Sequence, residues 1–110
     1  MIREFDTGAT RDGEVGKIDY EGHLSPLVLK AYGEYMNRCR TMKDGSLRDS
    51  DNWQKGMPLS VYMKSLFRHF LDLWHQHRSV LPNKQKQIED CCGILFNTQG
   101  YLFELLRDSA

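Results

Sequence analysis

The segment from Leu59 to Arg78 constrains the fold most, because its apolar residues cover most of a helical circumference. They recur at spacings of three and four, which is the period of an α-helix and not of a strand: Val61, Tyr62, Met63, Leu66, Phe67, Phe70, Leu71, Leu73 and Trp74. A helix with only a narrow polar strip must bury most of its surface, in a bundle or against another subunit. We therefore expect an all-α fold built around this helix.

Two further helices are predicted, one on each side of this segment. Ser25-Pro26 is a typical helix start, with a hydroxyl cap followed by proline, and the apolar stripe behind it continues to about Arg40. Pro82-Asn83 breaks the chain, and a third helix is expected over residues 86–107. Three helices this apolar exceed what one small subunit can cover, so we expect a homodimer or a higher homo-oligomer.

The rest of the chain is predicted to be irregular. Residues 1–24 carry four glycines among charged side chains and read as an irregular arm, with at most a short extended piece at Lys17–Tyr20. Residues 41–58 are polar and rich in turn residues, and a loop of this length inside a compact domain often carries function. We expect one domain over residues 1–110, with its helical core at 25–110.

Composition narrows the class of partner. The 15 Lys and Arg residues balance 15 Asp and Glu residues, whereas bulk nucleic-acid binding usually needs an excess of basic residues. No apolar run approaches the ~20 residues of a membrane span, and the N-terminus has no apolar signal region. Cys39, Cys91 and Cys92 match no zinc spacing and are expected to be reduced thiols. The composition favours a cytoplasmic protein that binds neither membranes nor bulk nucleic acid.

Polar side chains on the second helix are candidates for chemistry. His69 and Asp72 share a stripe with Ser65 and Gln76, and a histidine and a carboxylate three residues apart can reach one cation or one phosphate-bound water. The alternative is the ordinary wet edge of an amphipathic helix.

The third helix places Asn97 between two glycines, Gly93 and Gly100, on the same side as Asp90. A glycine inside a helix costs roughly 1 kcal/mol relative to alanine. The pair therefore indicates that something comes close to this face. One alternative is that a flat ligand or another backbone lies against this face. The other is close packing of a neighbouring helix, whose side chain also forms a hydrogen bond with Asn97.

Two irregular segments offer groups that bind phosphates. The loop over residues 48–56 combines carboxylates that can ligate Mg²⁺, cations that can meet phosphates, and Trp53, which can stack on a base or simply fill the core. The candidate ligands in this loop are Arg48, Asp51, Trp53 and Lys55. In the arm, Arg11 follows a flexible Thr-Gly-Ala-Thr stretch that can fold over an anion.

Three ordered motifs carry a resemblance to a known family. They are TGATRDGEVGKIDYEGHLSPLVL in the arm, LRDSDNWQKGMPLSVYMKSLFRHFLDLW in the loop and second helix, and IEDCCGILFNTQGYLFELL in the third helix. Together they resemble a phage and prophage family of dATP/dGTP diphosphohydrolase N-terminal-type domains, related to the all-α, MazG-like nucleoside triphosphate pyrophosphohydrolases. The similarity covers nearly the whole chain.

The resemblance implies Mg²⁺-dependent hydrolysis of a purine (deoxy)nucleoside triphosphate to the monophosphate and pyrophosphate, in the cytoplasm of an infected or lysogenic host cell. Carried onto this sequence, Asp72, Glu89 and Asp90 are the catalytic and metal-ligating candidates. The supporting ligand-binding candidates are Arg11, Arg48, Asp51, Trp53, Lys55, Arg68, His69 and Asn97.

One departure from the family pattern keeps a second function open. MazG-like enzymes carry a Glu-Glu-x-x-Glu motif on one helix and an acidic pair three residues apart on a later helix. The first helix here offers only Glu34, and the acidic pair of the third helix, Glu89 and Asp90, is adjacent. The alternative is a non-catalytic or weakly catalytic binder that sequesters a host immune signal, such as a cyclic dinucleotide or an ADP-ribose derivative. A plain helical interaction module is a third reading.

Overall fold

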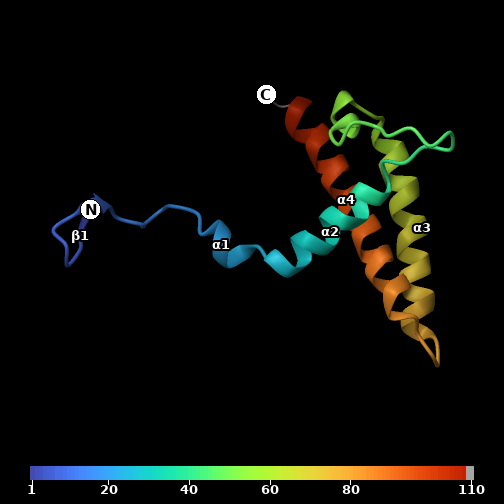
Figure 1. The fold of residues 1–110 in the computed structure, drawn as a ribbon, viewed down its shortest axis with the longest axis horizontal. Coiled ribbons are helices and arrows are strands. Elements are labelled where there is room, and N and C mark those ends of the chain that lie inside the picture. The colour runs from blue at the N-terminus through green and yellow to red at the C-terminus, as the bar shows by residue number, and fades with distance from the viewer. Residues whose placement is uncertain (109–110) are drawn as a thin grey trace.

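The structure, a computed structural model, describes residues 1–108 and is mostly helical. Its elements are β1 (Ile2–Glu4), β2 (Thr10–Asp12), α1 (Tyr20–His23), α2 (Pro26–Arg38), the 3-10 helix η1 (Asn52–Lys55), α3 (Leu59–Arg78) and α4 (Lys84–Asp108). The helices α3 and α4 lie side by side and run antiparallel, α2 packs across α4, and the N-terminal segment extends away from all three (Figure 1).

The three long helices confirm the sequence prediction, and their ends have identifiable causes. The Ser25 hydroxyl accepts a hydrogen bond from the Val28 N–H at 3.3 Å and so caps α2. The helix α4 begins two residues earlier than predicted, because the Asn83 side chain accepts from the Lys86 N–H at 3.0 Å at its start. Gln76 holds the preceding turn by accepting from the Asn83 N–H at 2.8 Å.

The N-terminal arm is more regular than predicted, so the all-α description needs a correction. Strands β1 and β2 pair antiparallel, with Ile2 opposite Asp12. Their turn uses Gly8, at a φ of +87°, whose N–H donates to the Phe5 carbonyl at 2.8 Å. Strands of three residues are too short to show an alternating pattern in the sequence. The short helix α1, capped by Asp19, begins at Tyr20, where the expected extended piece ends.

Contact between α3 and α4 depends on the two glycines of α4. A Cβ on Gly100 would lie 2.2 Å from the Tyr62 ring, and a Cβ on Gly93 would lie 2.6 Å from Nδ1 of His69. Flat side chains of α3 therefore lie directly on the α4 backbone. Of the two alternatives left open by the sequence, the structure shows close helix packing. Asn97 is satisfied within its own helix and not by a neighbouring one, because its Nδ2 donates to the Gly93 carbonyl at 2.7 Å.

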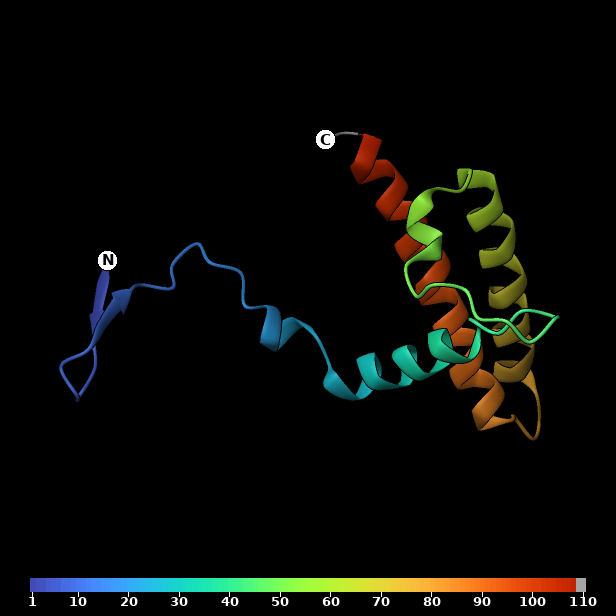
Figure 2. The same cartoon turned by 45° about the horizontal axis from the view of Figure 1, so that its top comes forward.

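The 41–58 loop is fixed to α4 by one aromatic side chain and two hydrogen bonds. Trp53 lies edge-on to Phe103, with ring centroids 5.1 Å apart, and to Phe96 at 6.0 Å. Arg107 donates to the Gln54 carbonyl at 3.1 Å, and the Met57 N–H donates to the Glu104 carboxylate at 3.2 Å. The loop thus lies across α3 and α4 on the side where α2 crosses (Figure 2).

The cysteines and the hydropathy of the helices bear on two further expectations. Cys39, Cys91 and Cys92 are all free, as expected, and only Cys92 is buried. Within residues 1–108, no helix combines the length and the apolar character that crossing a bilayer requires.

Replacing Gly100 with alanine tests the helix contact. The added methyl meets the Tyr62 ring at 2.2 Å, and overpacking of this kind costs about 1–3 kcal/mol, more than the ~1 kcal/mol gained in helix propensity. Urea unfolding at a fixed protein concentration should show a lower midpoint for Gly100→Ala. Gly33→Ala is the matched control, because nothing lies within 4 Å of its Cβ, and it should raise the midpoint. Equal effects of the two variants would contradict the contact.

Candidate functional site

A cavity of about 360 Å³ lies where the end of α2, the 41–58 loop, α3 and α4 meet. Its volume is at the small end of the roughly 300–1,000 Å³ range of small-molecule sites. Its lining residues are Tyr35, Met36, Cys39, Arg40, Arg48, Asp49, Ser50, Asn52, Trp53, Met57, Val61, Tyr62, Ser65, Arg68, His69, Phe96 and Asn97.

The cavity lining carries more positive than negative charge. Arg40, Arg48 and Arg68 contribute guanidinium groups, whereas Asp49 is the one carboxylate among the lining residues. Hydrogen bonds place Arg40 and Arg48 side by side: Arg40 Nε donates to the Arg48 carbonyl at 2.8 Å, and the Arg48 N–H donates to the Arg40 carbonyl at 2.9 Å. In the described part of the chain, the side chains of Arg48 and Arg68 have no ion-pair partner. Such a lining attracts anions.

Neutral polar groups complete the lining. Asn97 is 3 % exposed and projects from α4 beside His69, whose ring lies on Gly93. Burial raises the pKa of Tyr35 to about 12, and the nearby Cys39 thiol adds to the shift. Like any tyrosine at neutral pH, Tyr35 is protonated, and its phenol can donate a hydrogen bond to an acceptor in the cavity.

Aromatic rings form the apolar part of the lining. Trp53 is held edge-on against Phe96, and Phe96 in turn packs edge-on against Tyr62 at 6.0 Å. The two roles considered for Trp53 are therefore compatible, because its ring fills the core beside α4 and also lines the cavity. A ring fixed in this way can contact an aromatic ligand without first being ordered.

Five of the eight predicted ligand-binding residues line the cavity. They are Arg48, Trp53, Arg68, His69 and Asn97. The other three, Arg11, Asp51 and Lys55, are not among the lining residues: Arg11 lies on β2 in the distant hairpin, and Asp51 and Lys55 flank and end η1.

Sequence reasoning missed Arg40 and Tyr35, which the end of α2 brings to the cavity. Tyr35 belongs to the apolar stripe of α2, and its spacing gives no sign of a cavity. Arg40 reaches the cavity because the chain turns back at an isolated bridge between Thr41 and Leu47. The polar Ser65 was part of the stripe noted on the second helix, and it does line the cavity.

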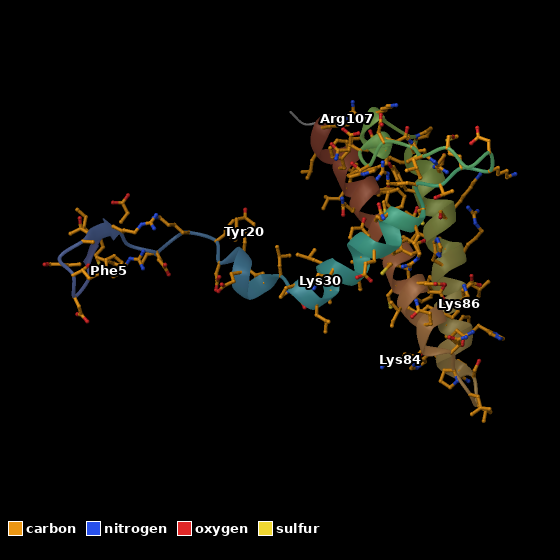
Figure 3. All side chains as sticks on the ribbon, in the orientation of Figure 1. Phe5, Tyr20, Lys30, Lys84, Lys86 and Arg107 are labelled. Atoms are coloured by element: carbon orange, nitrogen blue, oxygen red, sulfur yellow. The ribbon has the colours of Figure 1, made fainter. Side chains whose placement is uncertain are left out.

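The three predicted catalytic carboxylates lie outside the cavity lining. Asp72 and Asp90 converge, but on the ammonium group of Lys86, which is 3.5 Å from Asp72 Oδ2 and 3.0 Å from Asp90 Oδ1. Glu89 lies on another face of α4, where its carboxylate accepts from Gln85 Nε2 at 3.5 Å. Lys86 lies near the start of α4 (Figure 3). Its ammonium group takes the position between two carboxylates where the resemblance led us to expect Mg²⁺.

The Lys86 ion pair leaves one buried oxygen unsatisfied. Asp90 is 1 % exposed, and its Oδ2 has no hydrogen-bond partner. The hydrogen bond to Asp90 raises the pKa of Lys86, and the charges of Asp90 and Asp72 add to the shift. Among residues 1–108, no three His, Cys, Asp or Glu side chains are grouped so as to hold a metal ion. As arranged here, Asp72, Glu89 and Asp90 do not fit a magnesium site.

Comparisons of the chain with protein-family models, with curated proteins and with solved structures gave no match.

Removing the Lys86 ammonium should destabilise the fold through Asp90. Loss of one partner of a buried pair costs about 3–5 kcal/mol, and we expect about 2 kcal/mol for Lys86→Met because its side chain is 42 % exposed. In the double variant with Asp90→Asn the loss should be smaller than the sum of the two single losses. Urea unfolding measures all three, with Lys84→Met as the control on the same helix. Additive losses would show that the two side chains do not interact.

Proposed function

We propose that this protein binds a small anionic ligand that carries an aromatic ring, of the nucleotide or nucleotide-derived class, in the cavity between α2, the 41–58 loop, α3 and α4. The supporting observation is the combination of unpaired Arg48 and Arg68 with Trp53 in one lining, within the described residues. A guanidinium group binds phosphate oxygens in a bidentate manner, and an indole provides a flat contact for a base.

The remaining lining residues suit the polar edge of such a ligand. The amide side chains of Asn52 and Asn97 offer donors and acceptors, and Tyr35 offers a protonated phenol. The cavity volume of about 360 Å³ suits one nucleotide unit better than an extended polymer. A polymer would also require a basic surface that continues beyond the cavity, and the chain has no net positive charge.

Capture of an intact ligand agrees with this arrangement better than metal-dependent hydrolysis. The acidic groups expected to activate water are paired with Lys86 and do not line the cavity. Magnesium-dependent hydrolysis of a purine (deoxy)nucleoside triphosphate is the second candidate function, favoured by the buried Asp90 oxygen that has no partner. It would require Lys86 to leave its place between Asp72 and Asp90.

Incubation followed by chromatography separates the two candidates. The full chain is mixed with dATP, dGTP, a cyclic dinucleotide or ADP-ribose, with and without Mg²⁺. Capture predicts that an intact compound elutes with the protein irrespective of Mg²⁺. Release of pyrophosphate that Asp90→Asn abolishes would instead establish the hydrolase. If none of these compounds is retained or hydrolysed, both candidate functions are rejected.

Arginine substitutions test the cavity itself. A hydrogen bond to a charged group contributes about 1.5–3 kcal/mol, so Arg48→Ala and Arg68→Ala should each weaken binding of the retained compound by roughly 10- to 100-fold. Isothermal titration calorimetry provides the measurement. Arg78→Ala is the matched control, because it removes the same charge from the far end of α3. Equal weakening by all three variants would indicate an effect of net charge and not of the cavity.

A further inference from the structure

A single copy of this chain exposes far more surface than a folded protein of its size. Its accessible surface is 9,222 Å², whereas a compact monomer of 12.9 kDa has about 6,300 Å². The radius of gyration is 19.3 Å, compared with about 13 Å for a compact domain of this length. Part of this excess belongs to the extended arm, and part of it lies on the α3/α4 pair.

The helix α3 carries an unpartnered apolar stripe. Met63, Phe67, Phe70 and Trp74 follow one another at spacings of four, three and four residues, which places them on one side of the helix. Phe67, Phe70 and Trp74 are 66 %, 55 % and 54 % exposed. A soluble chain rarely leaves three large aromatic side chains together in water.

The helix α4 carries a matching stripe. Its positions recur at spacings of three, four, three and four, and each of them is exposed: Ile88, Cys91, Leu95, Thr98 and Leu102. Leu95 marks the edge of the stripe, because it also lines a cavity of about 310 Å³ with Val28 and Leu29 of α2. None of these side chains is charged. A stripe with this period is typical of helices that pack in bundles.

Both stripes lie on the same side of the α3/α4 pair. At about 100° of rotation per residue, each stripe is roughly a third of a turn from the contact between the helices, which His69 and Asn97 mark. Arg68 of α3 and Phe96 of α4 lie about as far round in the other direction, toward the cavity. In an antiparallel pair these rotations bring both stripes to one face. We call this surface, opposite the cavity, the bare face.

We propose that the bare face is the docking surface for a second copy of this chain, so that two α3/α4 pairs form a four-helix bundle around a two-fold axis. Three half-exposed aromatic side chains of about 200 Å² each leave roughly 350 Å² of apolar surface. The exposed parts of the aliphatic side chains in the two stripes add to this area, and the total approaches the ~800 Å² that each partner buries in a standard interface.

A second copy fits the bare face better than a different protein. The stripe positions of α3 and α4 are uncharged, so they offer no electrostatic feature by which an unlike partner would be selected. A two-fold arrangement pairs a face with itself, and an uncharged apolar face is complementary to itself. The cavity lies on the opposite side, so each copy keeps its own cavity, and the proposal goes beyond ligand binding.

Mass measurement tests the proposal directly. Sedimentation equilibrium of the full chain at about 20 µM should give twice the chain mass, since an apolar interface of standard size is normally stable at micromolar concentration. Phe70→Glu should weaken association by more than about 100-fold, because it places a charge at the centre of the face. Val80→Glu is the matched control: Val80 is 97 % exposed but lies in the turn after α3, and its variant should keep the double mass.

A fluorescence measurement keeps the test decisive if Phe70→Glu fails to fold. The chain has 2 tryptophans, so Trp53→Phe leaves Trp74 as the sole emitter. In the folded protein at the same concentration, Trp74 should be protected from acrylamide, with quenching about threefold weaker than in urea. A monomeric wild-type mass overturns the proposal. A double mass with freely quenched Trp74 also overturns it, because the copies would then meet elsewhere.

Discussion

The close approach of α3 to α4 is the interaction on which the other features depend. Rings of Tyr62 and His69 lie on the backbone at Gly100 and Gly93, where any side chain on α4 would prevent the contact. Two such contacts, seven residues apart, fix the rotation of α3 about its own axis. That rotation turns Arg68 toward the cavity and the aromatic stripe toward the opposite face. The two surfaces of the hairpin thus acquire different chemistry from one packing arrangement.

The same packing separates two kinds of charge. Asp90 and Asn97 are seven residues apart on α4, which corresponds to about 10 Å along the helix axis. Asp72 and Asp90 lie near the turn between α3 and α4, where Lys86 pairs with both. The arginines are gathered where the loop meets α2. Because Asp72 and Asp90 are distant and already paired, only Asp49 offsets the three arginines of the cavity lining, and the positive potential there persists.

The sequence predicted those features that depend on local chemistry. Helix ends follow from Ser25 and from proline positions, and the helical period identified all three long helices. The glycines beside Asn97 correctly indicated a close approach. Convergence of Asp72 with Asp90 was also anticipated, but the shared cation is Lys86, which stands four residues before Asp90 at a spacing that commonly forms ion pairs within a helix. The positions of the acidic residues alone do not show that a lysine, and not a metal ion, lies between them.

What the sequence did not predict depends on how the 41–58 loop folds back toward α2. Arg40 joins Arg48 only because the chain reverses between them, through a turn in which Gly45 has a φ of +86°. No periodic pattern in the sequence predicts that Arg40 and Arg48 lie side by side.

The cavity consequently has one wall, contributed by α3 and α4, that helix packing fixes, and another that depends on loop anchors at Gln54 and Met57. A ligand that bridges Arg48 on the loop and Arg68 on α3 would join these two walls. Because Trp53, Gln54 and Met57 already anchor the loop to α4, little of the intrinsic affinity would be used to order it.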